Sequence, residues 1–106
     1  MRKGSQFQAA YREGARRRCG ALTLIVAPGP PGPPMVGFVA GRKVGRAVAR
    51  NRAKRRLRAA IAQSRLESDT VYVLVADKGV LEAEFGRLVG WIERCLEKMT
   101  LAGEAR

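Results

Sequence analysis

Histidine is absent from this sequence, which removes the commonest catalytic base and the commonest side-chain metal ligand. The two cysteines, Cys19 and Cys95, lie far apart and form no CxxC motif. No metal site is therefore predicted, because zinc sites are built from neighbouring cysteine and histidine ligands. We interpret both cysteines as small residues of the core or its edge, in a protein of a reducing compartment.

Acidic residues are almost missing from the first part of the chain. Residues 1–65 contain 16 lysines and arginines and one acid, Glu13, whereas residues 66–106 contain five basic and eight acidic residues. The serines have no recognisable base beside them, and neither GxGxxG nor GxxxxGK[ST] occurs. We therefore predict no catalytic residue and no nucleotide-binding loop, and expect the protein to act by binding.

Long apolar runs are missing as well. None approaches the roughly 20 residues that span a bilayer, and the N-terminus lacks the apolar core of a signal peptide. We expect a cytoplasmic protein that does not bind membranes. The 106 residues are enough for one modest core, so a single domain over residues 1–106 is predicted.

Positive charge is what the sequence has in excess, with a net charge of +12. Residues 42–58 contain nine basic residues and no acid: Arg42, Lys43, Arg46, Arg50, Arg52, Lys54, Arg55, Arg56 and Arg58. Repulsion between like charges would destabilise such a helix in isolation, and a polyanion would relieve it. Arginine dominates, and its planar fork suits bidentate contact with phosphate. We predict a nucleic-acid-binding element here.

The same segment has the periodicity of a helix. Its apolar residues fall on one stripe, formed by Ala49, Ala53, Leu57 and Ala60 with Ile61 at the edge. A ladder of cations at i, i+4 spacing runs beside the stripe and consists of Arg46, Arg50, Lys54 and Arg58. Arg56 falls near the stripe, so its charged end must reach outward along its stem. One face of this helix is expected to pack while the rest stays basic.

The remaining segments predict an α+β fold with a sheet of about four strands backed by helices. A helix is expected after Ser5, with Ser5 as its N-cap and Gly14 at its end, and an amphipathic helix is expected from about residue 82. Strands are predicted over 21–27, 35–40 and 71–76, with a turn or short edge strand at 15–20. The run at 71–76 is apolar enough for a central strand.

The proline-rich segment 28–34 is predicted to be a loop, because proline cannot enter a helix or a sheet interior. A hairpin connection between the strands on either side is the preferred interpretation, and binding to a proline-recognising domain is the alternative. Phe7 and Tyr11 are four residues apart, so their rings share one face of the first helix. They could pack into the core or form a stacking platform for unpaired bases.

The basic segment also resembles a known family, the bacterial ribonuclease P protein component. The resemblance lies in an uninterrupted signature: Arg42, Lys43, Val44 and Gly45, then Ala47 and Val48, then Arg50, Asn51 and Arg52, then Lys54, Arg55 and Arg56. It extends over most of the chain, including the first helix, the strand with Val36 and Gly37, and the last helix. The resemblance implies a left-handed crossover through the basic helix, and a protein that binds the catalytic RNA of ribonuclease P and precursor tRNA.

Further expectations follow from this resemblance. The RNA subunit would use Mg²⁺ to remove the 5′ leader of precursor tRNA, and the protein would carry no cofactor and need no obligate protein partner. Residues implied to contact the catalytic RNA are Arg42, Lys43, Arg46, Arg50, Asn51, Arg52, Lys54, Arg55 and Arg58. Residues implied to contact the leader are Phe7, Tyr11 and Lys78. The chain departs from the family pattern at Met35, Gly41, Arg46 and Asp77, and Ile25 stands where an aromatic residue is common in the leader cleft.

Two competing functions share the basic helix. A ribosomal or other structured-RNA-binding protein without a processing role would not need the Phe7–Tyr11 cleft. A DNA-binding protein of the helix-turn-helix class would need a helix and a tight turn before the basic helix, where this sequence predicts a strand.

Overall fold

The structure, a computed structural model, describes residues 3–104 and confirms the α+β class. The elements follow one another as α1 (Lys3–Glu13), β1 (Ala15–Cys19), β2 (Leu22–Pro28), β3 (Met35–Ala40), α2 (Ala47–Ile61), β4 (Thr70–Ala76) and α3 (Phe85–Glu104). Two short 3-10 helices, η1 (Arg42–Val44) and η2 (Lys78–Leu81), precede α2 and α3. The segment that was predicted as a turn or short edge strand is an edge strand, β1.

The four strands form one mixed sheet in the order β1-β2-β4-β3. β4 pairs antiparallel with β2 and parallel with β3, so it is a central strand as predicted. The hairpin predicted between β2 and β3 is wrong, because β4 lies between these two strands. The near-continuous apolar run of β4 favours a position with a neighbour on both edges, and this displaces the local pairing.

The proline-rich loop therefore passes around the start of β4 instead of closing a hairpin. Asp69, just before β4, holds the loop with its backbone and its carboxylate. Its backbone N–H donates to the Gly32 carbonyl (2.8 Å), its carboxylate accepts from the Gly32 N–H (2.7 Å), and its carbonyl accepts from the Gly29 N–H (2.9 Å). These bonds fix the path from β2 to the outer strand β3.

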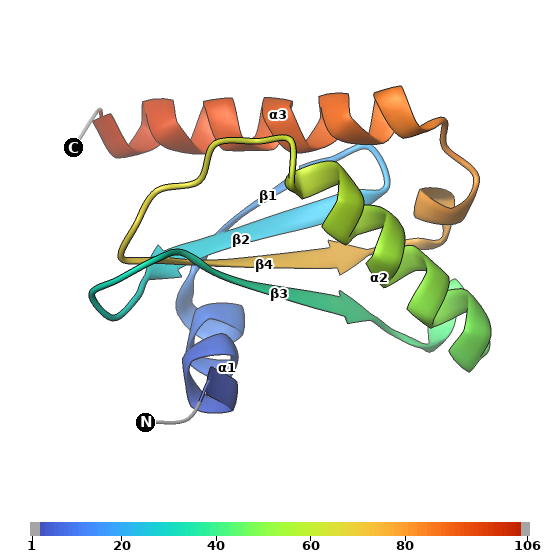
Figure 1. Cartoon of the computed structure of the whole chain (residues 1–106), viewed down its shortest axis with the longest axis horizontal. Coiled ribbons are helices and arrows are strands. Elements are labelled where there is room, and N and C mark those ends of the chain that lie inside the picture. The colour runs from blue at the N-terminus through green and yellow to red at the C-terminus, as the bar shows by residue number, and fades with distance from the viewer. Residues whose placement is uncertain (1–2, 105–106) are drawn as a thin grey trace.

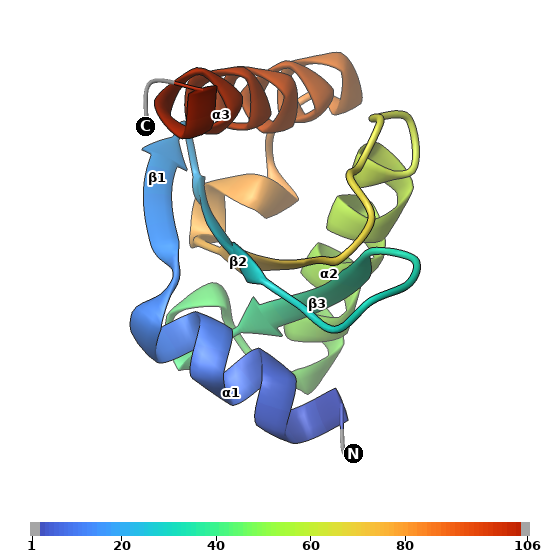
Figure 2. The same ribbon diagram turned by 90° about the vertical axis from the view of Figure 1, so that its left-hand side faces the viewer.

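The connection from β3 through α2 to β4 is a left-handed crossover. In Figure 1, β3 and β4 both run to the right, β3 lies below β4, and α2 crosses on the near side of the sheet. Figure 2 agrees, since from the left-hand side α2 lies to the right of the sheet. This hand opposes the usual right-handed preference of βαβ units.

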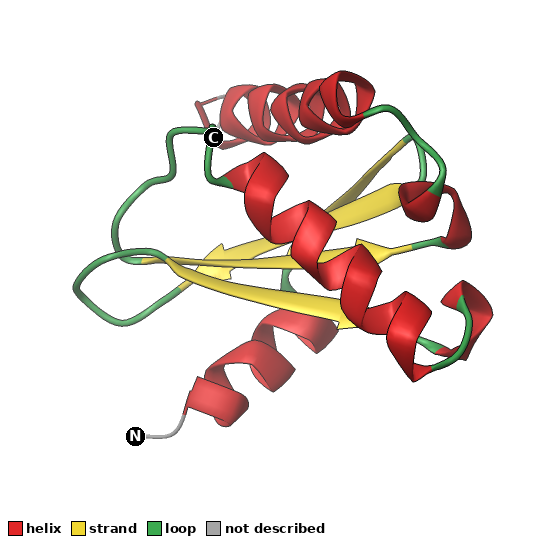
Figure 3. Ribbon diagram, turned by 45° about the vertical axis from the view of Figure 1, so that its right-hand side comes forward, coloured by secondary structure: helices red, strands yellow, loops and turns green. Residues whose placement is uncertain are grey.

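One face of the sheet is closed by α2 and α3, as Figure 3 shows. The side chains between these layers are large and fully buried, among them Leu22, Leu24, Leu57, Leu74, Leu88 and Ile92. Cys19 and Cys95 are also buried in this layer, as predicted, and both are free thiols. This layer forms the larger part of the core.

On the opposite face the one helix among residues 3–104 is α1, which lies across the strands in Figure 2. Its buried cluster is small and consists of Ala10, Ile25, Val71 and Val73. α1 begins at Lys3, so Ser5 lies inside the helix and the prediction of Ser5 as its N-cap is wrong. A cap contributes only about 1 kcal/mol, and it does not decide where a helix that packs on a sheet begins. The helix ends before Gly14, as predicted, where the Gly14 N–H donates to the Ala10 carbonyl (2.7 Å).

Candidate nucleic-acid interface

Helix α2 packs through the narrow stripe that its sequence predicts. Ala53, Leu57, Ala60 and Ile61 are buried, and Ala49 is half-buried at the start of the stripe. Because the stripe is narrow, most of the helix circumference is left to cations. Arg46, Asn51, Arg52, Arg55 and Arg58 are exposed, together with Arg42 and Lys43 of η1, while Arg50 and Lys54 are half-buried.

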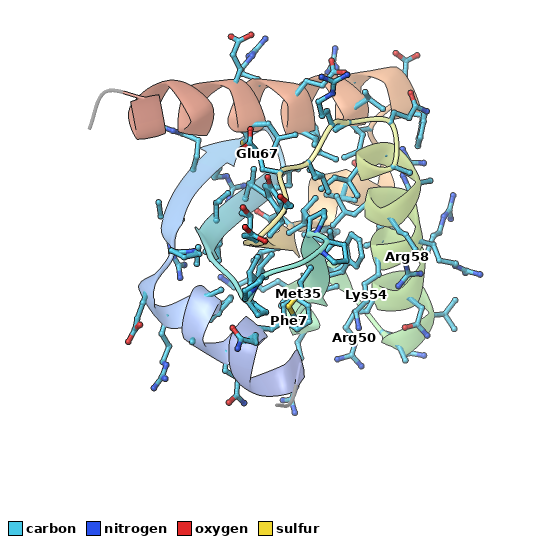
Figure 4. The ribbon with its side chains drawn as sticks, turned by 60° about the vertical axis from the view of Figure 1, so that its left-hand side comes forward. Phe7, Met35, Arg50, Lys54, Arg58 and Glu67 are labelled. Carbon is cyan, nitrogen blue, oxygen red and sulfur yellow. The ribbon has the colours of Figure 1, made fainter. Side chains whose placement is uncertain are left out.

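Among the described residues, no acid forms an ion pair with the cations of α2. Within the part of the chain that the structure describes, the ion pair present is Arg18–Asp77, away from α2. Figure 4 shows Arg50, Lys54 and Arg58 in line on the flank of α2 toward Met35 and Phe7. A row of cations without acidic partners on one helix produces the kind of positive field that attracts polyanions.

Two arginines of α2 have partners within the fold. The guanidinium of Arg58 lies over the Phe38 ring, 5.1 Å from its centroid, in a cation–π contact. Arg56, half-buried, donates a hydrogen bond to the Ala83 carbonyl between η2 and α3. The sequence predicted that the charged end of Arg56, beside the packing stripe, reaches outward along its stem. This prediction is wrong, because Arg56 is half-buried and its guanidinium bonds within the fold to Ala83, which joins α2 to the segment before α3.

A cleft of about 700 Å³ lies between α1 and the sheet. Its lining is mostly apolar and comes from α1, β3 and β4: Phe7, Gln8, Tyr11, Arg12, Gly37, Phe38, Val39 and Val73. Tyr11 keeps 42% of its surface exposed, whereas Phe7 is half-buried. Of the two interpretations of these aromatics, a purely core role does not hold for Tyr11, and the two rings do line one cleft.

Gly37 of β3 lets the Phe7 ring approach the sheet. A Cβ at this position would lie 2.9 Å from one carbon of the ring and 3.0 Å from the next. Such distances are below ordinary van der Waals contact, so any larger residue would push the ring outward. The resemblance named Gly37 only as part of its strand, and its contact with Phe7 was not predicted because Phe7 is 30 residues away on another element.

The open end of the cleft is marked by arginines that site prediction missed. Arg12 lines the cleft, and the guanidinium of Arg16 lies over the Tyr11 ring, 5.2 Å from its centroid. Arg16 also donates a hydrogen bond to the Tyr11 carbonyl. The run Arg16–Arg18 was visible as charge, but its position beside Tyr11 depends on how β1 pairs with β2.

Two positions that the resemblance associated with the leader or its cleft do not line the cleft. Ile25 is fully buried beneath α1, where its side chain would contact any Cβ added to Gly14, so it is part of the core and not of the open cleft. Lys78 is exposed at the start of η2, beyond the end of β4, and is not among the cleft-lining residues. Its backbone N–H donates to the Asp77 carboxylate (2.8 Å).

Asp77 forms an ion pair with Arg18. Its carboxylate accepts a hydrogen bond from the Arg18 guanidinium at 2.7 Å, and this contact, with the Lys78 N–H, lowers the pKa of Asp77 below its usual range.

Among the described residues no group of three or more His, Cys, Asp or Glu could hold a metal ion, and no helix is long and apolar enough to cross a membrane.

Comparison with known proteins decides what this arrangement belongs to. The family model described as Ribonuclease P matches residues 1–100. The chain is 36% identical over 104 residues to the ribonuclease P protein component of Chloroflexus aggregans, covering 95% of this chain and 77% of the relative. It is 38% identical over 98 residues to the ribonuclease P protein component of Symbiobacterium thermophilum, covering 90% of this chain and 85% of the relative. The chain belongs to the ribonuclease P protein family.

Solved structures show the same fold. The ribonuclease P protein of Thermotoga maritima matches with a TM-score of 0.77 at 19% identity, over 92% of this chain and 94% of that one. The protein from Staphylococcus aureus matches with a TM-score of 0.74 at 18% identity, over 93% of each chain. The family membership implied by the basic signature is therefore confirmed, and the protein is the accessory protein subunit of the ribonuclease P enzyme.

Proposed function

We propose that the basic helix binds the RNA subunit of ribonuclease P while the α1 cleft binds the 5′ leader of precursor tRNA. The observation that carries the proposal is the position of the two surfaces. An aromatic cleft lies on one face of the sheet, and unpaired cations line the flank of α2 toward it (Figure 4). One rigid domain would thus hold the catalytic RNA and its substrate in register.

The proposed contacts with the RNA subunit are phosphate contacts. They would come from Arg42, Lys43, Arg46, Arg50, Asn51, Arg52, Lys54, Arg55 and Arg58. The exposure of most of these side chains supports the proposal, as does the absence of ion pairs on α2 among the described residues. Arginine and lysine contacts to phosphate position an RNA without reading its sequence.

The proposed contacts with the leader combine stacking and charge. Unpaired bases would stack on Phe7 and Tyr11, each contact contributing about 1–3 kcal/mol. Arg12 lies in the same cleft and would face the backbone of the leader. Lys78, outside the cleft at the end of β4, would contact the leader where it leaves the sheet.

The phosphodiester hydrolysis itself is assigned to the RNA subunit. Mg²⁺ bound by that RNA would supply the nucleophilic water and stabilise the leaving oxygen. The role of this chain would be to position the leader and to reduce repulsion between the two RNAs. We propose that the protein works in the cytoplasm, as a single domain, without an obligate protein partner.

The test is cleavage of a 5′-extended precursor tRNA by a bacterial ribonuclease P RNA at low Mg²⁺, with and without the protein. The protein should restore cleavage, and Phe7→Ala and Arg50→Ala should each weaken the rescue. Binding of the RNA subunit, measured separately, should be weakened by Arg50→Ala and not by Phe7→Ala. Tight RNA binding without any rescue would contradict the proposed role in leader processing.

A further inference from the structure

The register of the sheet divides the face beneath α1 into two rows that run across the strands. The first row joins Arg16, Ile25, Val73 and Gly37, which pair successively across β1, β2, β4 and β3. Residues paired in this way project from the same face of a sheet. Helix α1 covers this row, since Ala10, Ile25 and Val73 are all nearly or fully buried and Phe7 lies on Gly37.

The second row is the next one toward the end of β4, and it is only partly covered. It joins Arg18, Thr23, Val75 and Val39. The three residues of its floor, Thr23, Val75 and Val39, are half-buried, whereas their neighbours on the opposite face, Leu22, Leu24 and Leu74, are fully buried. A shallow, mostly apolar track therefore continues from the cleft, where Val39 is already part of the lining.

Two arginines lie where this track reaches the outer edge of the sheet. Arg16 lies beside α1, with its guanidinium over the Tyr11 ring, and Arg18 is the last residue of the second row. Arg18 holds Asp77 in an exposed ion pair, with 58% and 42% of the two side chains accessible. Exposed pairs of this kind contribute little to stability, so a phosphate could replace the carboxylate at small cost.

We propose that a single RNA strand leaves the Phe7–Tyr11 cleft, crosses the sheet over Val39, Val75 and Thr23, and is held by its phosphates at Arg16 and Arg18. The crossing spans three strand-to-strand intervals of about 4.8 Å each, which is the length of a few nucleotides. The inference rests on the proposed leader-binding function and extends it, because it assigns the far part of the leader to strand β1.

The strand β1 contains its own control. Arg17 has the same charge and is also exposed, but it pairs with Leu24, so its side chain projects from the face that α3 covers. Its backbone carbonyl accepts the weak hydrogen bond of the Cys95 thiol (3.5 Å). If only net charge mattered, replacing any of the three arginines would weaken leader binding equally. The proposed track predicts a loss for Arg16 and Arg18 and none for Arg17.

The experiment uses the complete holoenzyme, assembled from a bacterial ribonuclease P RNA and the full chain. The affinity for precursor tRNA is measured with leaders lengthened one nucleotide at a time, for the wild type, Arg16→Ala, Arg18→Ala, Arg17→Ala and Phe7→Ala. We expect Arg16→Ala and Arg18→Ala to match the wild type with short leaders and to bind long leaders several-fold more weakly. Each should also lower the salt slope by roughly 0.7, the value for one phosphate contact to a single strand.

Three outcomes would overturn the proposal. Equal losses in Arg17→Ala and Arg16→Ala would show a general charge effect. A loss that is the same at every leader length would assign the two arginines to the RNA subunit instead. An undiminished gain from long leaders in both variants would show that the strand takes another path. If Phe7→Ala still lowers the affinity for precursor tRNA in that case, the proposal that the cleft binds the leader is retained. If the affinity of the wild-type holoenzyme does not depend on leader length at all, the proposed leader-binding function is itself refuted.

Discussion

The two faces of the sheet are built in different ways. The face under α2 and α3 is closed by fully buried leucines and isoleucines, whereas the face under α1 has a cluster of four buried residues beside an open cleft. A single short helix cannot cover a sheet of four strands, so one row of side chains stays half-exposed. Stability is thus concentrated on one face, and the other face is free to bind.

Charge follows the same division. Helix α2 packs mainly with alanines, together with Leu57 and, at its end, Ile61, which keeps its backbone close to the sheet and leaves the outer surface to arginine. Helix α3 packs with Leu88, Ile92 and Cys95, and its exposed side carries both signs of charge. The helix with the narrower apolar stripe is the one that carries the proposed RNA-binding surface, and it relies on the rest of the core to hold it.

The largest effect is expected on stability, when a buried side chain is removed from the face that α2 and α3 cover. Leu74→Ala removes a fully buried side chain from the middle of β4, and such changes destabilise by about 2–5 kcal/mol. Val75→Ala, its neighbour on the open face, should lower the free energy of unfolding by much less because Val75 is half-buried. Urea unfolding of the two variants measures the comparison directly. Equal losses would mean that the open face bears as much of the stability as the closed one.

The next largest effect is expected on binding of the RNA subunit, and it distinguishes the proposed RNA-binding arginines of α2 from Arg56, which bonds within the fold. Arg50→Ala and Arg52→Ala should each weaken binding of the RNA subunit by about tenfold or more, since hydrogen bonds to charged groups contribute about 1.5–3 kcal/mol. Each should also flatten the salt dependence by about one unit of log slope. Their stability to urea should be unchanged.

Arg56→Ala should show the opposite pattern, because Arg56 bonds to the Ala83 carbonyl and joins α2 to the segment before α3. We expect a loss of about 1–3 kcal/mol in the free energy of unfolding and an unchanged salt slope. Titration of labelled ribonuclease P RNA over a series of salt concentrations provides the slope. A reduced slope in Arg56→Ala would mean that this side chain exchanges its carbonyl for a phosphate.

Much of this arrangement was predictable from local pattern. The stripe of Ala53, Leu57 and Ala60 identified the packed side of α2, and the apolar run at 71–76 identified the central strand. These signals lie within one element, where side-chain periodicity reflects burial directly. The family signature lies within the same short segment, and for that reason the sequence alone was enough to recognise it.

What could not be predicted depends on pairing between distant segments. The hairpin predicted between β2 and β3 is wrong because the preference of β4 for a central position outweighs the short connection between these two strands. Gly37 and Arg16 gain their roles from Phe7 and Tyr11, which belong to another element. The register of β1 against β2 separates Arg17 from Arg16 and Arg18, and no periodicity within β1 indicates which face is open.

A smaller effect is expected from Gly37→Ala on the open face. The added Cβ would lie 2.9 Å from the Phe7 ring, which must move outward. We expect a loss of stability of about 1 kcal/mol, because overpacking on a half-exposed face is partly relieved by the ring. The protein-dependent gain in leader affinity should fall, while the affinity for the RNA subunit should not change. An unaltered leader affinity would mean that the position of the Phe7 ring is not critical for stacking.

The smallest effect at ordinary pH concerns the buried thiols of the closed face. Burial and the neighbouring Cys19 thiol raise the pKa of Cys95 from 9.0 to about 12. Between these values the unfolded chain loses a proton that the folded protein keeps, so the free energy of unfolding falls as the pH rises above about 9. In Cys95→Ala this alkaline decline should be shallower, which urea unfolding at a series of pH values can measure.

The same burial predicts slow alkylation of Cys95 by iodoacetamide at pH 8. Rapid alkylation of the native protein would show that α3 separates from the sheet more readily than its buried leucine contacts predict.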